Sequence, residues 1–392
     1  MNLSVITTSS LSVFGGQERV LVTVVKNLKS KYGCHLSLIS LPPSSGKLRL
    51  PPSEEFSDVH IWRGSSYLTI WGAVLHGLVK KLLHMPVLFN RPILEKCFSI
   101  LQSSQVVLVT SPFLLSSVSD LITKHGSNCS IVYWDHGWLA YYHRSDLTLY
   151  RLVRRVLFHK ELIRGIKLAD AHLAISSGIA EIIKRIHPEA KVYLVYNPVP
   201  RYDGPIIQRP RKPIFLYVGR ISNGDKNISF MLKGLSRLKH KDWQLKIVGT
   251  GPDEKKLKKL AGKLGIADRI SWLGFRKDPY SEFQEITALL LTSRYEGFGM
   301  VLVEANQRGI PVISSDCESG PKDIVITGVN GYLYREGDMD EFVRIVSDVI
   351  DGRLSFDTPE NIAKTAERFR EDVVAENIYR ALKQMCDASK TF

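Results

Sequence analysis

Residues 288–323 read ALLLTSRYEGFGMVLVEANQRGIPVISSDCESGPKD, and this stretch decides the fold class. The apolar run 288–292 predicts a buried strand, the segment around Glu304 predicts a helix, and 311–314 predicts a second strand. Strand, helix and strand in this order form a βαβ unit, which places two parallel strands in one sheet. The stretch therefore indicates an α/β fold built on a parallel sheet.

The loop between this strand and this helix combines glycines with carboxylates. Gly297 and Gly299 leave space for a ligand to approach backbone N–H groups, and the N-terminus of the following helix favours an anion. Glu296 and Glu304 have seven residues between them, and their oxygens can accept hydrogen bonds from hydroxyl groups. The ordinary alternative is a pair of exposed acids that complement the helix dipole. The intervening glycines favour a phosphate site with two carboxylates left for hydroxyls.

Length and charge limit the possibilities for the whole chain. At 392 residues the chain exceeds the usual size of one hydrophobic core, so two domains are expected. The formal net charge is +14. Residues 1–200 hold 22 Lys and Arg against 12 Asp and Glu, whereas residues 201–392 hold 31 against 27. The first half therefore favours an anionic partner or surface, such as a phospholipid leaflet or nucleic acid.

The cysteines and the N-terminus indicate a cytoplasmic protein. The five cysteines are odd in number and scattered without a CxxC pair, which argues against a disulfide framework or a zinc site. The N-terminal residues MNLSVITT lack the basic region of a signal peptide. The longest apolar segment also falls short of the roughly 20 residues that span a bilayer.

Strand-like runs alternate with helical or irregular segments in both halves of the chain, which is typical of doubly wound parallel sheets. In the first half these runs lie at 3–7, 36–41, 106–110, 131–134 and 172–175, with a Gly15-Gly16 loop and a helix over 17–28 after the first run. In the second half they lie at 214–218, 245–248, 270–273, 288–292 and 312–314.

A proline-rich segment, 197–213, separates the two series and suits a linker. We therefore expect two Rossmann-like domains, 1–200 and 201–372, that face each other across a cleft. The final segment, 373–392, holds a helix with no strand after it, and we expect this helix to cross back to the first domain.

Two segments of the first half, 76–101 and 150–168, are both basic and apolar. One interpretation is a pair of helices that pack one face on the sheet and expose the other. The second interpretation is a helix on a membrane surface, whose Lys and Arg side chains meet anionic head groups. Both interpretations can hold for the same helix.

Two cations follow the first strand of the second half. Arg220 ends the run IFLYVGR, and Lys226 lies six residues later in a loop before the helical run 228–238. Arginine can bind a phosphate group through two hydrogen bonds, and lysine adds a point charge, so the pair suits a diphosphate. The alternative is two solvated surface charges. Gly249 and Gly251 form only a fragment of a dinucleotide fingerprint, which is weak evidence for NAD.

Taken together, these motifs resemble the retaining glycosyltransferases of family 4, which have the GT-B architecture. The resemblance rests on the pair Arg220 and Lys226, the two glutamates, the glycines after the second strand and the N-terminal glycines. The segments LAISSGI, YNPV, LLLTS, DCESGPKDI and GVNGYLY are similar to a branch of the family that transfers galactose in lipopolysaccharide assembly. This similarity covers residues 170–340, whereas 41–168 shows little beyond the general fold.

The resemblance implies a role for each matching residue. Arg220 and Lys226 would neutralise the diphosphate of a UDP-sugar donor, Glu304 would bind its ribose, and Glu296 would lie near the transferred sugar. The donor site would further include Gly15, Gly16, Gly249, Gly251, Phe298, Gly299, Met300 and Val301. His136 would contact the transferred sugar near its anomeric carbon, although a histidine at a strand end is equally often structural.

The resemblance also implies the reaction. We expect a metal-independent transferase, with no cofactor, that moves a hexose of the galactose or glucose type from a UDP-sugar to a cell-envelope glycan or lipid-linked acceptor. Residues 1–200 would bind the acceptor and residues 201–372 the donor, at the inner face of the membrane. The alternatives are a UDP-sugar epimerase of the same fold that transfers nothing, and a basic lipid- or nucleic-acid-binding module. The balanced charge of the second half disfavours nucleic acid.

A possible metal motif has a simpler explanation. Asp338-Met339-Asp340 spells the DxD sequence with which some transferases hold a divalent metal. It directly precedes the helical run EFVRIVSDVI, and Asp338 with Glu341 has the spacing of a helix N-cap and its partner. We therefore expect a cap and no metal site.

Overall fold

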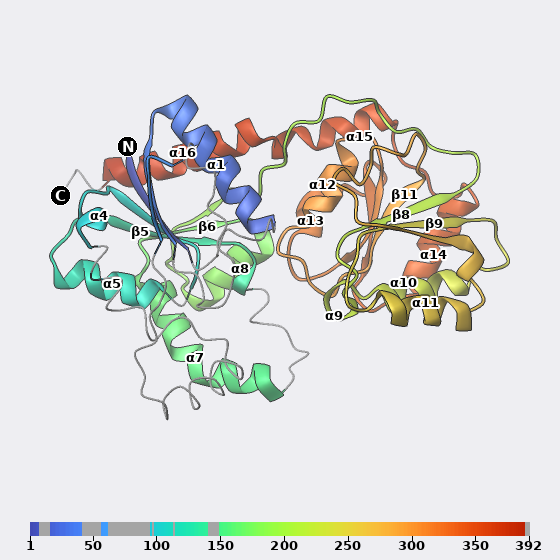
Figure 1. Cartoon of the computed structure of the whole chain (residues 1–392), viewed down its shortest axis with the longest axis horizontal. Coiled ribbons are helices and arrows are strands. Elements are labelled where there is room, and N and C mark those ends of the chain that lie inside the picture. The colour runs from blue at the N-terminus through green and yellow to red at the C-terminus, as the bar shows by residue number, and fades with distance from the viewer. Residues whose placement is uncertain are drawn as a thin grey trace. The chain divides into compact units, whose positions relative to one another are not determined.

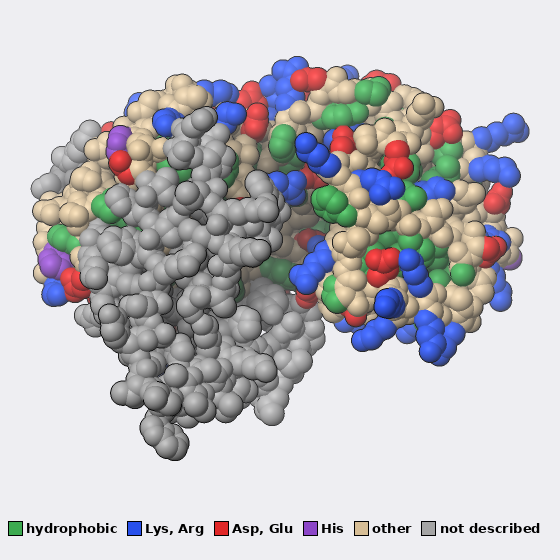
Figure 2. Space-filling model, in the orientation of Figure 1, with side chains coloured by type: hydrophobic (Ala, Val, Ile, Leu, Met, Phe, Trp, Pro, Cys, Tyr) green, Lys and Arg blue, Asp and Glu red, His purple; other side chains and the backbone are tan. Residues whose placement is uncertain are grey.

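The computed structural model describes residues 1–7, 16–40, 56–61, 95, 98–112, 114–139 and 149–388 (Figures 1 and 2). The chain divides into two compact units. Unit 1 contains Met1–Pro198 and Glu371–Phe392, and unit 2 contains Val199–Arg370. The corresponding boundaries predicted from the sequence are 200 and 372.

In the described part of unit 1, parallel strands form one seven-stranded sheet in the order β3-β2-β1-β4-β5-β6-β7. These strands are β1 (Asn2–Thr7), β2 (His35–Ser40), β3 (Asp58–Ile61), β4 (Val106–Val109), β5 (Ser130–Asp135), β6 (Ala171–Ala174) and β7 (Val192–Leu194). β1 lies between β2 and β4, with Val5 opposite both Leu38 and Leu108. The Val- and Leu-rich runs are buried because both faces of a parallel sheet are covered.

Helices cover this sheet. The described ones are α1 (Gly16–Tyr32), α4 (Phe98–Gln102), α5 (Leu115–Lys124), α7 (Leu149–Leu168), α8 (Ser177–Ile186) and α16 (Glu371–Ala388). The last helix, α16, packs on α1, where the rings of Tyr32 and Tyr379 stack with centroids 4.0 Å apart. Helix α7 lies against α5 at Gly165, where a Cβ atom would meet Leu115 Cβ at 2.8 Å.

Unit 2 contains a six-stranded parallel sheet in the order β10-β9-β8-β11-β12-β13. Its strands are β8 (Ile214–Val218), β9 (Gln244–Val248), β10 (Ile270–Gly274), β11 (Ala288–Leu291), β12 (Val312–Asp316) and β13 (Gly331–Arg335). Its helices are α9 (Asn223–Lys226), α10 (Ile228–Ser236), α11 (Glu254–Lys263), η1 (Ala267–Arg269), α12 (Met300–Asn306), α13 (Pro321–Ile324), α14 (Met339–Ile350), α15 (Pro359–Thr365) and η2 (Glu367–Phe369).

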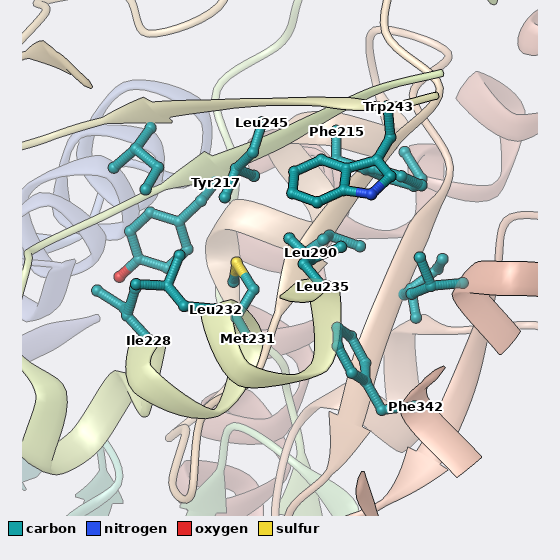
Figure 3. Packing of buried hydrophobic residues seen from close by; sticks show 14 of the residues in the cluster. Phe215, Tyr217, Ile228, Met231, Leu232, Leu235, Trp243, Leu245, Leu290 and Phe342 are labelled. Carbon is teal, nitrogen blue, oxygen red and sulfur yellow. The ribbon is translucent and has the colours of Figure 1, made fainter. Parts of the chain in front are cut away.

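The core of unit 2 lies between the sheet and its helices (Figure 3). Phe215 and Tyr217 on β8 pack with Leu290 on β11 and with the apolar face of α10. Phe342 on α14 reaches Gly234 on α10, where a Cβ atom would lie 2.5 Å from its ring. Burial of each such side chain contributes about 1.5–3 kcal/mol, so this core fixes the strands whose ends carry the candidate site.

The proline-rich segment around 197–213 is not a free linker. The division between the units falls at Pro198, and the residues after it belong to unit 2. Ile207 is buried, and the Arg209 guanidinium donates to the carbonyls of Phe356 and Asp357 at 3.1 and 2.8 Å. Prolines favour an extended backbone, but extension does not prevent side chains from docking on a neighbouring surface.

Two further predictions concern the cysteines and the basic segments. The four described cysteines, Cys34, Cys129, Cys317 and Cys386, are buried and form no disulfide with one another. Within the described residues no helix is both long enough and apolar enough to span a bilayer. Of the two basic segments, 76–101 lies almost entirely outside the described residues, whereas 150–168 forms α7.

Candidate active site

The candidate site of unit 2 lies where the strand order reverses. β8 and β11 are adjacent at the centre of the sheet, and the chain leaves them toward opposite sides, with β9 next to β8 and β12 next to β11. Ligands of open parallel sheets bind at the carboxyl ends of strands at such a reversal. Arg220 and Lys226 follow β8, and Glu296 follows β11. The topology therefore brings together the residues predicted from two distant stretches of sequence.

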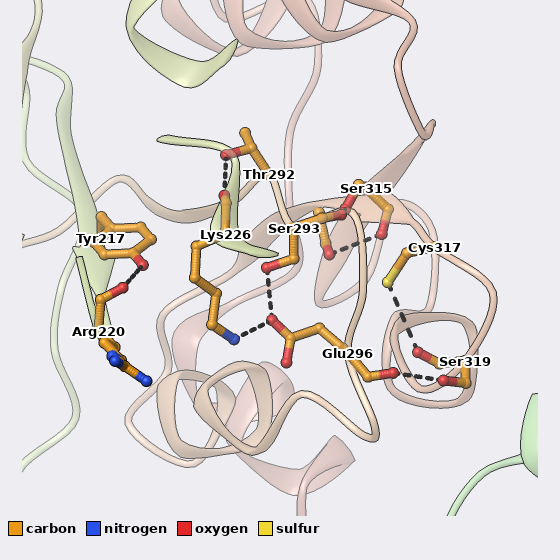
Figure 4. Close-up of polar contacts among 10 residues, drawn as sticks. Tyr217, Arg220, Lys226, Thr292, Ser293, Glu296, Ser315, Cys317 and Ser319 are labelled. Atoms are coloured by element: carbon orange, nitrogen blue, oxygen red, sulfur yellow. Dashed lines mark hydrogen bonds and ion pairs between the residues drawn. The ribbon is translucent and has the colours of Figure 1, made fainter. Parts of the chain in front are cut away.

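Lys226 and Glu296 are in direct contact (Figure 4). Lys226 Nζ donates to Glu296 Oε1 at 2.6 Å, and Ser293 Oγ donates to the same oxygen at 2.6 Å. The Glu296 side chain is only 10% exposed and that of Lys226 25%. A buried carboxylate is costly to desolvate unless cations and hydrogen-bond donors compensate it, and here both are present. The site is thus organised around one carboxylate oxygen.

Lys226 is held by the backbone around it. It ends the short helix α9, where the sequence had predicted a loop, and Asn227 follows in a left-handed conformation with φ of 48°. Thr292 Oγ1, directly after β11, contacts the carbonyls of Lys226 and Asn227 at 3.1 and 3.2 Å. Asparagine tolerates this conformation better than most residues. The turn therefore ties the end of α9 to the end of β11.

Arg220 presents an exposed cation beside this pair. Its side chain forms no hydrogen bond or ion pair within the part of the chain that the structure describes. Its backbone, in contrast, is fixed, because the buried Tyr217 hydroxyl donates to the Arg220 carbonyl at 2.9 Å. A positioned arginine without a partner is available to an incoming anion.

Glu304 lies within α12, and two side chains donate hydrogen bonds to backbone carbonyls of this helix. Arg308 Nη1 donates to the Glu304 carbonyl at 2.9 Å, and Tyr280 Oη donates to the Val301 carbonyl at 3.2 Å. The Arg308 guanidinium stacks between the rings of Tyr280 and Tyr202, 4.4 and 4.1 Å from their centroids. As predicted, only the second glutamate is helical, because α12 begins at Met300.

The glycines serve two different needs. Gly299, the residue before α12, has φ of 95°, a conformation that other residues rarely adopt. Gly249 combines a φ of 137° with close packing, because an added Cβ atom would lie 1.9 Å from the Gly219 carbonyl oxygen. At Gly251 the reason is packing, because an added Cβ atom would lie 2.2 Å from the Ile221 carbonyl oxygen. Close packing of two loops thus explains these two glycines without reference to a ligand.

The segment after β12 supports the Glu296 loop. Ser315 Oγ donates to the Ser293 carbonyl at 2.6 Å, and Ser319 Oγ donates to the Glu296 carbonyl at 2.5 Å. Both serines are buried. Burial, together with the Glu296 charge, raises the pKa of the neighbouring Cys317 to about 12, so this thiol stays protonated. The motif DCESG is therefore a support for the loop that carries Glu296.

His136 belongs to unit 1 and follows β5. Its ring lies against that of Trp134, with centroids 4.6 Å apart. Both ring nitrogens are shielded from solvent, and no described residue bonds to either of them. Burial lowers the pKa of His136 to about 3, so the imidazole is neutral near pH 7, with one donor and one acceptor nitrogen. A buried polar group without a partner is rare, and a ligand hydroxyl would satisfy it.

Asp135 shapes the loop that carries this histidine. Its fully buried carboxylate accepts hydrogen bonds from the Tyr133 hydroxyl at 2.6 Å, from the Leu139 N–H at 3.1 Å, and from the Gly137 N–H. Burial raises the pKa of Asp135, and these donors act in the opposite direction. The chain therefore folds around the carboxylate at the end of β5, which sets the position of His136.

The remaining predicted residues divide as follows. Gly15 lies outside the described residues, and Gly16 is the first residue of α1 instead of part of a loop. Asp338 is the N-cap of α14, as predicted, and its side chain accepts a hydrogen bond from the Glu341 N–H at 2.9 Å. Among the described residues there is no cluster of three or more His, Cys, Asp or Glu suited to a metal ion.

Sequence reasoning did not single out Ser293, Thr292, Tyr217 or Asp135. The Thr-Ser pair directly after the apolar strand of 288–291 was an available signal, since side chains at the carboxyl end of a parallel strand border the ligand site. Tyr217 and Asp135 gave no comparable signal, because a buried tyrosine or strand-end aspartate becomes meaningful only when its hydrogen-bond partners are known.

Comparison with known proteins gives the class. The family Glycosyl transferases group 1 matches residues 203–369. The chain is also 36% identical over 245 residues to the lipopolysaccharide 1,6-galactosyltransferase of Escherichia coli K12, an alignment that covers 60% of this chain and 68% of that protein. The chain belongs to this family of glycosyltransferases, which confirms the predicted resemblance.

A second relative has a higher sequence identity to this chain, but the alignment covers a smaller share of that relative. The lipopolysaccharide 1,6-galactosyltransferase of Salmonella typhimurium is 41% identical over 234 residues, which cover 58% of this chain and 65% of that protein. The alignment therefore spans slightly less than two thirds of that relative. The reaction catalysed by that relative is therefore only proposed for this chain, below.

Solved structures confirm the fold. The apo form of the lipopolysaccharide outer core galactosyltransferase WaaB matches with a TM-score of 0.77 and 29% identity, over 98% of this chain and 99% of that one. HepE of Anabaena in complex with UDP matches with a TM-score of 0.70 over 98% of this chain and all of that one. At 18% identity, this second likeness concerns the fold alone.

Proposed function

We propose that this protein transfers a hexose, galactose or glucose, from a UDP-sugar to a glycan or lipid-linked acceptor of the cell envelope, with retention of anomeric configuration. The observation that carries the proposal is the cluster of Lys226, Glu296 and Ser293 at the strand-order reversal of unit 2, together with Arg220, whose side chain has no partner among the described residues. The names of the two lipopolysaccharide galactosyltransferases supply the substrate class.

The charges of the cluster suit the leaving group. Cleavage of the bond between the sugar and the diphosphate leaves negative charge on a phosphate oxygen and positive character on the anomeric carbon. Lys226 has three donor hydrogens, of which Glu296 takes one, so the ammonium can also bind a phosphate oxygen. Arg220 would add a second cation. Preorganised charges of this kind are usually the largest catalytic term.

Other residues of the chain would bind the remaining parts of the donor. Glu304 would accept hydrogen bonds from the ribose diol, and the backbone N–H groups of Phe298, Gly299, Met300 and Val301 would meet phosphate oxygens. His136 would bind a hydroxyl of the transferred sugar in its neutral form. In this proposal a phosphate oxygen of the leaving group helps to remove the acceptor proton on the same face, so a separate catalytic base is not required.

We propose further that no metal ion takes part. The proposal rests on the two cations available for the diphosphate and on the cap role of Asp338. Turnover of the purified enzyme should persist in excess EDTA. Complete loss in EDTA that added Mg²⁺ or Mn²⁺ restores would overturn this part of the proposal.

The direct test is a donor screen. UDP release is measured with UDP-galactose, UDP-glucose and their N-acetyl forms, with and without extracted envelope glycan. The expected result is release from one hexose donor that accelerates at least tenfold with acceptor. Conversion of one UDP-hexose into another without UDP release would instead identify an epimerase. Absence of both reactions and of UDP binding would refute the donor assignment.

We also propose that α7 contacts an anionic membrane at the inner face of the cell. In its described half, Leu162 and Ile166 are buried, whereas Lys160 and Lys167 are exposed beside Leu168, which is 38% exposed. Flotation with anionic liposomes should decrease with salt and in Lys160→Glu/Lys167→Glu. The matched control, Lys255→Glu/Lys259→Glu on the exposed face of α11, should float like the unaltered protein.

A further inference from the structure

The two oxygens of the Glu296 carboxylate have different surroundings. Oε1 accepts from both Lys226 Nζ and Ser293 Oγ, each at 2.6 Å. Oε2 has no partner among the described residues, and the whole side chain is only 10% exposed (Figure 4). An ionised carboxylate offers roughly four acceptor positions, and Oε2 is not among the fully buried atoms that lack a partner, so this oxygen can be reached by a ligand and can accept a hydrogen bond from it. This asymmetry indicates that Oε2 is reserved for a ligand.

Ser293 is the fixed member of this arrangement. It is fully buried at the end of β11, and Ser315 Oγ donates to its carbonyl at 2.6 Å. An ionised carboxylate can only accept, so the Ser293 hydroxyl must donate to Oε1. Lys226, in contrast, sits on a long flexible side chain that a diphosphate would attract. A short buried hydroxyl is therefore the donor that fixes the orientation of the carboxylate in both states.

We propose that Ser293 is a positioning residue that commits Oε1 of Glu296 to the protein and leaves Oε2 to accept a hydrogen bond from a hydroxyl of the donor sugar. This assignment rests on the proposed function and adds to it a residue that acts on the sugar but not on the nucleotide. Ser293 touches no reacting atom in this scheme. Its effect reaches the substrate only through Glu296.

The consequence is a separation between UDP and the UDP-sugar. In Ser293→Ala, Lys226 still pairs with Glu296 and still presents donors to a diphosphate, so the affinity for UDP should stay within about twofold. The Glu296 carboxylate loses the hydrogen bond that the Ser293 hydroxyl donates to it, and turnover of the UDP-hexose should fall roughly tenfold. The ratio between the affinity for the UDP-hexose and the affinity for UDP should also decrease in this variant. A serine whose only role is stability would weaken both ligands equally.

The matched control is Ser314→Ala. Ser314 is also fully buried, on the neighbouring strand β12, and its hydroxyl donates to the Ser315 carbonyl at 3.1 Å and to no other described residue. The Ser314→Ala substitution also removes one hydroxyl from a fully buried site, so it measures the general cost of a missing buried hydroxyl. We expect unchanged UDP affinity and unchanged turnover for this variant.

A double-mutant cycle identifies the route through Glu296. Affinities for UDP and for the UDP-hexose selected by the donor screen are measured by calorimetry in Glu296→Ala and in Ser293→Ala/Glu296→Ala. With no carboxylate to orient, the serine substitution should change nothing further. A full additional effect in the Glu296→Ala background, or equal losses for UDP and UDP-hexose in the single variant, would overturn the assignment.

The same measurements separate the two levels of the proposal. If the unaltered enzyme binds UDP and turns over a UDP-hexose while Ser293→Ala behaves like Ser314→Ala, the positioning role is wrong and the proposed function stands. If the unaltered enzyme neither binds UDP nor acts on any UDP-hexose, the proposed function fails and the role of Ser293 fails with it.

Discussion

The candidate residues of the two units are held in opposite ways. In unit 2, Glu296 is bound by Lys226 and Ser293, and the backbone around Lys226 is fixed by Thr292. In unit 1, His136 has no bonded partner among the described residues, although its loop is tied to Asp135. Unit 2 thus holds its charges ready before a ligand arrives, whereas unit 1 holds a neutral group whose hydrogen bonds are still to be made.

The difference follows from the cost of burial. A charge removed from water needs a countercharge at once, so a buried glutamate is found with its lysine. A histidine can avoid this cost by losing its proton, and burial lowers the pKa of His136 to about 3. Unit 2 is therefore suited to a charged diphosphate, and the His136 loop to an uncharged hydroxyl.

The largest effect should come from removal of the Lys226 ammonium group in unit 2. Lys226→Ala should reduce turnover roughly 10²-fold or more, because a preorganised stabiliser of the leaving phosphate is lost and Glu296 is left without its countercharge. Steady-state UDP release measures it. Lys246→Ala is the control, since this half-buried lysine of β9 bonds Ser271 instead of Glu296. Equal turnover in the two variants would remove Lys226 from the mechanism.

A second test concerns the rigidity of unit 2. Gly249→Ala should lower the free energy of unfolding by about 2 kcal/mol or more, because its Cβ atom would lie 1.9 Å from the Gly219 carbonyl oxygen. Gly262→Ala on α11 meets nothing within 4 Å and should be neutral or slightly stabilising. Denaturant unfolding compares them. Full stability with loss only of UDP binding in Gly249→Ala would show a ligand role instead of a packing role.

On the unit 1 side, His136→Ala should reduce turnover roughly tenfold while UDP affinity stays unchanged, because only a sugar hydroxyl loses its partner. Calorimetry with UDP and kinetics with the UDP-hexose measure the two quantities. His159→Ala, an exposed histidine on α7, serves as the control. A weaker affinity for UDP itself would mean that His136 acts on the nucleotide, and the contrast between the units would disappear.

The smallest effect is on stability as a function of pH. The folded pKa of His136, about 3, lies below the ordinary value of 6.5, so the unfolded chain binds more protons between these pH values. The stabilising contribution is fully present above pH 6.5 and decreases as the pH falls toward 3. Through this group the protein should be less stable at pH 5.5 than at pH 7.5 by up to about 1.4 kcal/mol.

The check is denaturant unfolding of the unaltered protein and of His136→Asn at these two pH values. The variant should lose less stability on acidification than the unaltered protein. His172, whose pKa burial lowers to about 4, provides the same pH dependence in both proteins and cancels in the difference. Identical pH dependence of the two proteins would mean that His136 titrates normally.

Much of the fold could be predicted from hydrophobic runs. The runs at 106–110, 214–218 and 288–292 became β4, β8 and β11 with end shifts of one residue at most, because a strand buried on both faces must be apolar throughout. The strands β3 and β7 were missed, since DVHI and VYL are short and lie at the sheet edges, where the apolar requirement is weaker. The proline-rich segment was taken for a linker because docking leaves no trace in composition.

The sequence by itself determined the α/β class and the family and singled out most residues of the candidate site, because these depend on local runs and on motifs of fixed spacing. Only the tertiary structure decided which residues meet. Lys226 and Glu296 are 70 positions apart and touch because β8 and β11 are neighbours in the sheet. The roles of Ser293 and Asp135 likewise became visible only there, since a hydrogen bond depends on position and direction in space, which residue spacing does not specify.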